Sequence, residues 1–524
     1  MKINYKLKKD VFVKNKLINL HFYDSKNINM KQPKSLHCAL LLLLFTFSAI
    51  AQNNSLKNTK PNIILVMTDD QGMGDLACMG NQVLKTPHID EFYGKSTRFA
   101  DFQVSPTCAP TRSAIMSGNR PFEVGVTHTI LQRERMSLDV FTMPQALQSA
   151  GYKTGLFGKW HLGDEEEYLP TNRGFDEVLM HGAGGIGQTR YGDFPPNEEN
   201  LYFDNVLLHN DTIVQTKGFC TDVFFDAAES WIKKQEETKQ PYFAYVALNA
   251  PHAPLVAPEK YKKRFLELGY DDGTAGRYGM IENIDDNFGE MMKKLEAWGT
   301  LDNTLVIFMT DNGATHLKGS LNGKKVNHFN ANLRGGKNSP FEGGTHVPAF
   351  WYWKGKFGEG VNIDGLTAHI DMYQTFCELA GVSLPKQMQK LSGKSLVPLL
   401  ENPKAEWADR ELFIHCGRWA AGKREEAKFA KSAVRTQQWR FDNNKELFDI
   451  SIDPSEKNNV ASEHPEVIVE LQKSYNHWWE NVKPLMVNEG LPKVEPEDQP
   501  LAKRYYKQLK EHGISNWAPE NTNN

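Results

Sequence analysis

The chain has 524 residues, of which 40% are hydrophobic, and it carries 61 Lys and Arg against 64 Asp and Glu. This composition excludes a disordered or low-complexity protein, and the near balance of charge excludes a strongly basic nucleic-acid binder. No internal repeat is evident. The length predicts two to four domains, or one large α/β domain with an appendage.

The first fifty residues differ from the rest, because they hold nine lysines, no arginine and two acids. Without them, 52 basic and 62 acidic residues remain, a net charge of −10. The apolar run from Cys38 to Ala51 follows two lysines and ends in small residues, which is typical of a secretory signal peptide cleaved after Ala51. An uncleaved anchor is the less favoured alternative, since a membrane span needs about 20 apolar residues. We therefore expect residues 1–29 to come from a misplaced start codon upstream of Met30, and residues 30–51 to be a signal peptide. The mature protein is expected to be exported, either periplasmic or secreted, without a membrane anchor.

Three short, β-rich apolar runs each end in polar residues, as buried parallel strands do. The runs are residues 61–68, which stop at Asp69 and Asp70; residues 242–248, which stop at Asn249-Ala-Pro-His252; and residues 304–310, which stop at Asp311-Asn312-Gly313. Helical patterns lie between them, among them residues 142–149 and 277–298. This alternation predicts an α/β fold with a large, mostly parallel sheet sandwiched by helices. Ligands bind such sheets outside the carboxyl ends of the strands, where these polar residues fall.

The character of the chain changes after about residue 405. Strand-like pieces follow at residues 411–415, 432–440 and 446–449, and a helical run at residues 465–482. The pattern predicts a smaller α+β C-terminal subdomain. The expected divisions of the mature chain are a large domain of residues 52–405, the C-terminal subdomain of residues 406–490, and a polar tail of residues 491–524, extended or helical, without a motif.

Two of the predicted strands end in hard oxygen ligands, which suit Ca²⁺ or Mg²⁺. These are Asp69 and Asp70 after one strand, and Asp311 and Asn312 after the other. Either pair alone is more typical of a helix N-cap or a turn. Their joint occurrence at strand ends favours a metal site.

The segment Cys108-Ala-Pro-Thr-Arg112 matches the pattern C-x-P-(S/T)-R. A lone cysteine can be a packed thiol, but this segment resembles the hallmark of the sulfatase family, whose cysteine a maturation enzyme converts to formylglycine. Further similarity, in family order from about residue 60 to 460, lies in Gly151-Tyr-Lys-Thr-Gly-Leu-Phe-Gly-Lys159-Trp-His161, Asn249-Ala-Pro-His252, Asp311-Asn312-Gly313, the run from Gly336 to Gly344, and Glu446-Leu-Phe-Asp449 with Asp453-Pro454.

The resemblance implies an alkaline-phosphatase-like fold and the hydrolysis of sulfate esters. The implied ligands of a Ca²⁺ ion, with Mg²⁺ as second choice, are Asp69, Asp70, Cys108, Asp311 and Asn312. The implied catalytic residues are Cys108, Arg112, Lys159, His161, His252 and Lys337.

These residue types meet the needs of the reaction. Sulfate-ester hydrolysis needs cations on the sulfuryl oxygens, a positioned nucleophile and an acid for the leaving alcohol. By similarity, Arg112 and Lys159 steady the formylglycine, and Lys159 and Lys337 neutralise the sulfuryl oxygens. His161 would take a proton from the second hydroxyl of the hydrated aldehyde, and His252 would protonate the leaving oxygen.

Five cysteines remain in the mature chain: Cys78, Cys108, Cys220, Cys377 and Cys416. They are too few and too scattered for a disulfide framework in a domain of this size. An odd number leaves one sulfur needing another explanation, and formylglycine formation at Cys108 supplies it.

The sequence also departs from the family pattern. Thr111 replaces the commoner Ser, Ser117 and Phe157 are unusual at their positions, and His346 stands where Arg is frequent. Cysteine, proline and arginine of the hallmark survive, so conversion of Cys108 is still expected. The other departures affect packing and pocket detail only.

Three further residues are weaker candidates for binding the substrate. His181 begins a glycine-rich run that is either a substrate loop or a simple connection. Arg418 and Trp419 could reach over the cleft to hold a sugar, but Trp419 could equally be a core residue.

The most favoured function is removal of sulfate from a carbohydrate, with no nucleic-acid or membrane partner. The alternatives are a phosphonate or phosphate ester hydrolase of the same superfamily and, less favoured, a non-catalytic sugar-binding relative, which would not need to retain Cys108 or His252. The net charge of −10 indicates no broad cationic track and favours short oligosaccharides as substrates.

Overall fold

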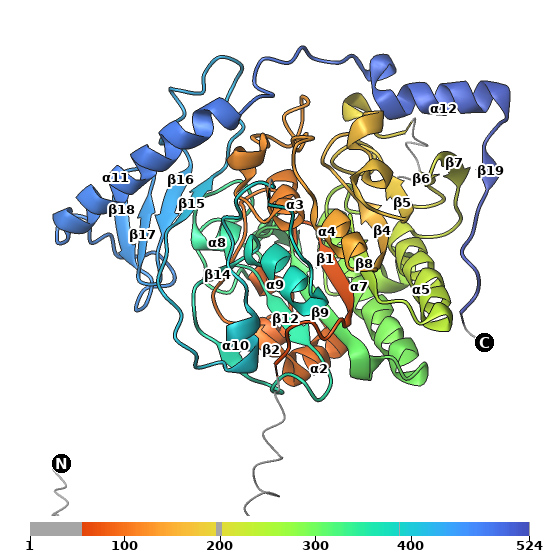
Figure 1. Cartoon of the computed structure of the whole chain (residues 1–524), viewed down its shortest axis with the longest axis horizontal. Helices are drawn as coiled ribbons and strands as arrows, with labels where there is room; N and C mark the ends of the chain where they lie inside the picture. Colours follow the sequence, from red (N-terminus) through yellow and green to blue (C-terminus); the bar gives the residue numbers. More distant parts are fainter. Residues whose placement is uncertain (1–54, 195–201, 387, 523–524) are drawn as a thin grey trace, which may run out of the picture. The chain divides into compact units, whose positions relative to one another are not determined.

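The computed structural model describes residues 55–194, 202–386 and 388–522 (Figure 1). Contacts between residues group Ser55–Asn524 into one compact unit. The predicted upstream extension and signal peptide, residues 1–51, lie outside the described residues. Among the helices of the described part, none has both the length and the apolar character that a membrane span requires.

The central sheet of the described chain has eleven strands, and its five middle strands, β9-β1-β8-β4-β5, are all parallel. The other strands extend the sheet on both sides through four antiparallel and two parallel pairings. The order across the sheet is β13 (Asn362–Ile363), β2 (Thr97–Phe99), β12 (Ala349–Tyr352), β9 (Thr304–Thr310), β1 (Asn62–Thr68), β8 (Tyr242–Ala247), β4 (Lys153–Lys159), β5 (Glu177–His181), β6 (Val206–His209), β7 (Thr212–Gln215) and β19 (Ser515–Asn516). The predicted mostly parallel sheet is confirmed.

Strand β1 shows why the sheet carries helices on both faces. Its side chains alternate, with Ile63, Leu65 and Met67 in one hydrophobic cluster and Ile64 and Val66 in the other. The first cluster is completed by α3 (Cys108–Ser117), α4 (Met143–Ser149), α9 (Asp371–Ala380) and α10 (Val397–Glu401). The second is completed by α2 (Pro87–Lys95), α5 (Cys220–Thr238) and α7 (Asp272–Ala297).

The register of β1 and β9 decides where the site forms. The two parallel strands pair Asn62 with Thr304 and Thr68 with Thr310, so they end at the same level. Asp69 directly follows β1 and Asp311 directly follows β9, so the two residues leave the sheet side by side.

The predicted helices differ from the structure mainly at their starts. Helix α4 begins after Thr142, whose side chain accepts from the backbone N–H of Gln145. Helix α7 begins at Asp272 rather than residue 277, because Asp271 caps it by accepting from Thr274 N at 2.9 Å. The first five residues of α7 include two glycines and show little apolar periodicity, which hid this start in the sequence.

The C-terminal region forms the expected small α+β layer. Its antiparallel sheet consists of β15 (Leu412–His415), β16 (Ser432–Arg435), β17 (Trp439–Asp442) and β18 (Glu446–Asp449), and α11 (Pro465–Val482) shares a hydrophobic cluster with it. The predicted single strand over 432–440 is wrong, because a turn closed by Thr436 N and Trp439 O, 2.8 Å apart, divides it in two. The boundaries at residues 405 and 490 stay predictions.

The tail has a place that the sequence did not predict. Helix α12 (Pro500–Glu511) leads to β19, which pairs in parallel with β7 at the edge of the central sheet. The Gln508 amide reinforces this edge, since it accepts from Ile213 N at 2.8 Å and donates to Ile213 O at 2.7 Å.

The remaining elements are short. They are β3 (Phe102–Gln103) paired with β14 (Thr367–Ala368), the hairpin of β10 (Lys318–Leu321) and β11 (Lys324–Asn327), and the helices α6 (Glu259–Glu267) and α8 (Glu342–Thr345).

Candidate active site

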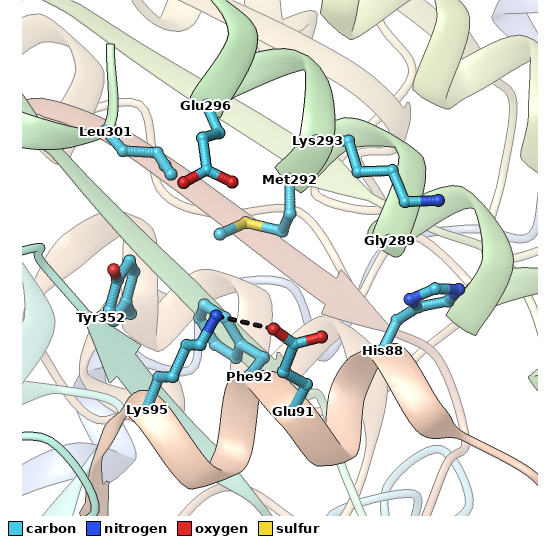
Figure 2. A pocket seen from close by; sticks show the side chains of 10 residues that line it. All are labelled: His88, Glu91, Phe92, Lys95, Gly289, Met292, Lys293, Glu296, Leu301 and Tyr352. Carbon is cyan, nitrogen blue, oxygen red and sulfur yellow. Dashed lines mark hydrogen bonds and ion pairs between the residues drawn. The ribbon is translucent and has the colours of Figure 1, made fainter. Parts of the chain in front are cut away.

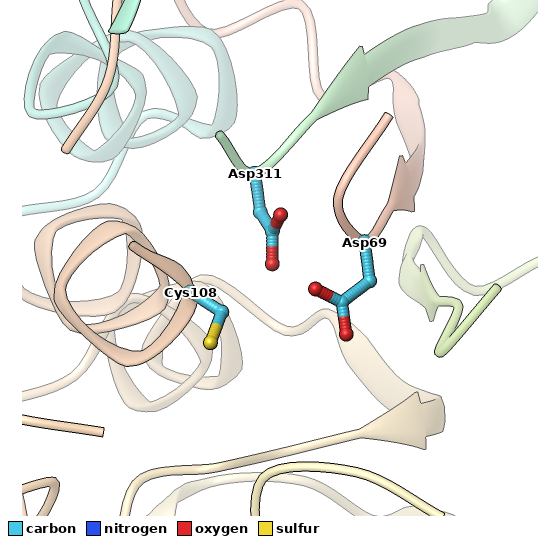
Figure 3. A group of neighbouring side chains, drawn as sticks. All are labelled: Asp69, Cys108 and Asp311. Carbon is cyan, nitrogen blue, oxygen red and sulfur yellow. The ribbon is translucent and has the colours of Figure 1, made fainter. Parts of the chain in front are cut away.

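The predicted metal ligands meet at the carboxyl edge of β1 and β9. One ligand atom each of Asp69, Cys108 and Asp311 lies within 4.8 Å of the others, and Figure 3 shows the three side chains converging from two strand ends and a helix. The backbone N–H of Asp70 donates to Asp311 Oδ1 at 3.2 Å, which ties the two strand ends together. Asp70 has a φ of +65°, and this left-handed conformation turns the chain directly after the strand.

Helix α3 brings Cys108 and Arg112 to the same edge. Cys108 is the first residue of the helix, and Arg112 lies four residues later on the same face. The Arg112 guanidinium donates to Asp311 Oδ2 at 2.8 Å and to the backbone oxygen of Lys159 at 2.9 Å. The start of α3 is thereby joined to β9 and β4.

Each of the three buried carboxylates has one cation as its partner, and two of these cations, Lys159 and Arg112, are fully buried. The pairs are Lys159–Asp69 at 2.6 Å, Lys337–Asp70 at 2.6 Å and Arg112–Asp311 at 2.8 Å. Burial opposes ionisation of Asp70, but the Lys337 ammonium and His252 hold the pKa of this carboxyl well below its usual range. The carboxylates can therefore stay ionised away from water, because each one is paired with a cation.

Two oxygen atoms of this cluster have no hydrogen-bond partner. They are Asp69 Oδ1 and Asn312 Oδ1, and both are buried. Burial, opposed by Lys159, raises the pKa of Asp69 to about 6, and burial with the Asp69 charge raises the pKa of Asp311 to about 6. A divalent cation would satisfy these oxygens and favour the ionised carboxylates, so the donor set fits a hard cation.

The Cys108 thiol differs from the other cysteines that the structure describes. All five are free, and burial raises the pKa of Cys78, Cys220, Cys377 and Cys416. Burial acts on Cys108 too, but the charges of Lys159 and Lys337 outweigh it and lower the pKa of its thiol. Cys108 is thus the cysteine placed for chemistry.

The two ring nitrogens of His161 have different surroundings. Its Nε2 lies 2.7 Å from the backbone oxygen of Thr129, which can only accept, so Nε2 carries the proton. Its Nδ1 is buried without a hydrogen-bond partner and therefore holds a free lone pair. Burial and then the Lys159 charge lower the pKa of His161 well below its usual value, which keeps the ring neutral.

His252 presents the opposite nitrogen. Its Nδ1 lies 2.6 Å from the backbone oxygen of Ala253, and its Nε2 lies 3.8 Å from Asp70 Oδ2. Burial lowers the pKa of His252, and the neighbouring Asp70 carboxylate opposes this shift. The backbone oxygen of His252 accepts from the Tyr202 hydroxyl at 2.8 Å, which fixes the segment.

The glycine-rich run after His181 packs against both histidines. A Cβ atom on Gly184 would lie 2.4 Å from His161 Nε2, and one on Gly185 would lie 3.2 Å from His252 Cε1. His181 itself is buried, opposite Lys159 in the register of β4 and β5, and its Nδ1 lies 2.8 Å from the oxygen of Gly182. The run is therefore a close-fitting cover of the site, and only glycine fits at position 184.

Sequence reasoning missed the residues that hold this cover in place. Asp193 accepts from the N–H of Gly182 at 3.1 Å and of Gly187 at 2.6 Å, which are the two ends of the run. The other anchors are Asp164, which accepts from Ala183 N at 2.9 Å, and Asn249, which accepts from Ile186 N at 3.3 Å. Neither aspartate lies in a recognisable motif, so no sequence signal could have found it.

The two candidates from the C-terminal region have different surroundings. The Arg418 guanidinium donates to the hydroxyl of Thr129, the residue whose backbone oxygen contacts His161. Trp419 is buried with Phe122 and Trp479, and its indole N–H donates to Glu489. This is the core position that the sequence left as an alternative for Trp419.

The departures from the family pattern are accommodated locally. The Thr111 hydroxyl exchanges hydrogen bonds with the Ser105 backbone, and the Ser117 hydroxyl donates to Ser113 O at 2.6 Å inside α3. Phe157 packs against Trp231 with ring centroids 5.8 Å apart. His346 Nδ1 lies 2.9 Å from Glu342 Oε2, at the junction with the small sheet.

A pocket between α2 and α7 is separate from this cluster. Figure 2 shows its lining, with Lys95 paired to Glu91 at 2.6 Å and His88 near Gly289. None of its lining residues is a predicted site residue.

Comparison with known proteins gives consistent matches. A family model described as Sulfatase matches residues 61–382, and one described as N-sulphoglucosamine sulphohydrolase, C-terminal, matches residues 337–481. The chain is 28% identical over 519 residues to an N-acetylgalactosamine-6-O-sulfatase of Bacteroides thetaiotaomicron, with 86% of this chain and 98% of that protein covered. It is 30% identical over 399 residues to the uncharacterized sulfatase YdeN of Escherichia coli, with 66% and 67% covered. The crystal structure of Ps i-CgsB in complex with k-i-k-neocarrahexaose has a TM-score of 0.70 and 27% identity, with 86% and 98% covered.

The close fit of Gly184 against His161 leads to a prediction. In Gly184→Ala, the new methyl group should displace the His161 imidazole from Thr129 O. The kcat for an aryl sulfate should then fall about 100-fold, which is the cost of misplacing a catalytic group by about 1 Å. Gly94→Ala is the matched control, because no atom lies within 4 Å of its Cβ position. Full turnover by Gly184→Ala would mean that the cover yields and does not position His161.

Proposed function

The chain belongs to the sulfatase family and is a sulfuric ester hydrolase, and on that premise we propose that it releases sulfate from a sulfated carbohydrate with a formylglycine derived from Cys108 and a Ca²⁺ ion. One observation carries this proposal: Cys108 and three carboxylate–cation pairs meet at one buried edge. A sugar-binding protein would not need to bury so many charges.

The modified residue and the ion supply the chemistry that the unmodified chain lacks. Hydrated formylglycine at position 108 would supply a geminal diol, with one hydroxyl as the nucleophile toward sulfur and the other to expel sulfate as the aldehyde re-forms, and a bound Ca²⁺ would lower the pKa of the nucleophilic hydroxyl. The residues that would hold Ca²⁺ are Asp69, Asp70, Asp311 and Asn312, with position 108 as a further ligand. Mg²⁺ is the second choice.

The cations of the site bind and orient the sulfuryl group. Lys159 and Lys337 hold their ammonium groups beside the proposed ion ligands, so both can neutralise sulfuryl oxygens. Arg112 is committed to Asp311 and to the oxygen of Lys159, so its role is to position residue 108 and the end of β4.

The two histidines divide the proton transfers. His161 is neutral and has a bare Nδ1, which suits a base that takes a proton from the second hydroxyl. His252 has Nε2 beside the Asp70 carboxylate, which opposes the lowering of its pKa by burial, and this position suits an acid for the leaving oxygen.

A sulfated sugar is the substrate that the relatives support. One relative is named as an N-acetylgalactosamine-6-O-sulfatase, and one similar structure holds a neocarrahexaose. Arg418, beside Thr129, is the better candidate for contacting the sugar, while His181 and Trp419 are buried. We further propose that a maturation enzyme converts Cys108 to formylglycine and that residues 30–51 direct export of the protein.

Conversion of Cys108 is the first test. Mass spectrometry of the tryptic peptide of residues 99–112 from active enzyme should show the aldehyde or its hydrate, and turnover should scale with the converted fraction. Cys108→Ala should be inactive, whereas Cys78→Ser, the control, should retain full turnover. A free thiol at position 108 in fully active protein would contradict the mechanism.

The metal is the second test. Chelation should abolish turnover and lower the melting temperature by several degrees, since an ion at a hundred times its Kd stabilises the fold by about 2.7 kcal/mol. Ca²⁺ should restore both quantities. Asp311→Ala should prevent the restoration, and Asp139→Ala, which changes an exposed carboxylate, should not. Stoichiometric zinc without Ca²⁺ or Mg²⁺ in active enzyme would refute the proposed ion.

The division of roles between the histidines is the third test. His252→Ala should lower kcat/KM for a sulfated sugar by about 100-fold or more, but that for an aryl sulfate much less, because a phenolate departs without an acid. His161→Ala should slow both substrates to one common step, with a burst of the first product. Equal losses for both substrates in His252→Ala, without a burst in His161→Ala, would show that the roles are assigned wrongly.

A further inference from the structure

The segment of the chain between Asn312 and Lys337 is unusually basic. Residues 313–337 contain five Lys and Arg and no Asp or Glu, in a chain whose acids outnumber its bases. The segment starts directly after Asn312 and ends at Lys337, so it connects a proposed ion ligand with a proposed sulfuryl-binding cation. Its charge therefore lies next to the reaction.

Three of these five cations are free to bind something outside the chain. Lys337 is paired with Asp70, and Arg334 with Glu446 at 2.9 Å. The other three, Lys318, Lys324 and Lys325, are exposed, and the described part of the chain provides no ion pair for them. All three belong to the hairpin of β10 and β11.

The hairpin has one polar and one packed face. Its register places Lys318 opposite Asn327, and Ser320 opposite Lys325, and cross-strand partners share a face. On the other face, a Cβ atom on Gly319 would lie 2.3 Å from the Thr274 hydroxyl of α7. The polar face therefore points away from α7 and combines two ammonium groups with an amide and a hydroxyl.

The hairpin begins at the site itself. Thr315 N donates to Asp70 O at 3.4 Å, and Lys337 N donates to Ala314 O at 3.0 Å. The bond from His328 N to Leu317 O, 2.9 Å long, closes the base of the hairpin. Four residues of strand extend about 13 Å from this base, a distance that spans a few sugar units.

The carboxylate of Asp271, beside the hairpin, binds backbone groups and forms no ion pair with the hairpin lysines in the described part of the chain. Asp271 accepts from the backbone N–H groups of Ser320 and Thr274 at the outer edge of β10. The Asp271 carboxylate thus caps α7 and holds β10 against the start of that helix. Asp272 is paired with Lys262 at 2.6 Å.

We propose that the polar face of the β10–β11 hairpin binds the anionic chain of a sulfated glycan beyond the sulfate ester held in the site. The inference rests on the proposed function and adds to it that the substrate carries further anionic groups along its chain. Lysine ammonium groups bind sulfate or carboxylate as point charges, while Asn327 and Ser320 can bind sugar hydroxyls. Because the groups are exposed, the binding is weak for each contact and is screened by salt.

The test uses dextran sulfate as the probe and the double variant Lys318→Ser/Lys325→Ser. At low salt, the Kd of the full enzyme for dextran sulfate should rise about tenfold, since two exposed ion pairs contribute roughly threefold each. Inhibition of aryl sulfate turnover by dextran sulfate should weaken by the same factor. Turnover of the aryl sulfate alone, which has no further anionic group, should stay within about twofold of wild type.

The control is Lys507→Ser/Lys510→Ser, which removes two exposed lysines from α12. It should leave the Kd and the inhibition unchanged. Three outcomes would each overturn the inference. They are an equal rise of the Kd in the control, an unchanged Kd in the hairpin variant, and a higher Kd in the hairpin variant with unchanged inhibition by dextran sulfate. If the wild type turned over no sulfate ester at all, the proposed function would fail, and the direct binding measurement would still decide on the hairpin.

Discussion

Three carboxylates and three cations must be buried together at one edge of the sheet, and much of the fold follows from that requirement. An unpaired charge in this position would be strongly destabilising, by about 3–5 kcal/mol when one partner is removed. The partners come from distant segments: β4 supplies Lys159, α3 supplies Arg112, and the loop after the β10–β11 hairpin supplies Lys337. The strand order β9-β1-β8-β4 and the position of α3 are what bring them together. The site is thus also a junction that holds the layers in register.

The same pairing sets the charge that a ligand meets. With each acid matched by a base, the cluster is close to neutral, and the proposed divalent ion would make it positive by two charges. A sulfate ester is an anion, so the occupied site would attract it although the chain is negative as a whole. The glycine-rich cover packs against the two histidines beside this charge, because Asp164, Asp193 and Asn249 hold its backbone there.

The sequence was sufficient for features that depend on local pattern and insufficient for those that depend on distant contacts. The strands ending at Asp69 and Asp311 could be predicted, since apolar runs followed by acids mark buried parallel strands. The bond between Arg112 and Asp311 and the anchoring of the cover by Asp193 join segments with no shared pattern. Trp419 shows a different limit, because an aromatic residue reads equally well as a sugar platform or as core until its neighbours are known. The pairing of β19 with β7 escaped for the same reason, as two residues are too few to show a strand period.

The two histidines show how backbone contacts assign different roles to one side-chain type. One nitrogen of each ring contacts a backbone oxygen, Nε2 to Thr129 in His161 and Nδ1 to Ala253 in His252, so opposite nitrogens are left free of the backbone. Burial lowers the pKa of both rings, and Lys159 adds to this shift in both, but in His252 the Asp70 carboxylate opposes it. This difference fits the proposed roles, with His161 as the proton acceptor and His252 as the proton donor. Since Lys159 and Asp70 also belong to the ion pairs of the cluster, the arrangement that makes burial of the charges possible also separates the base from the acid.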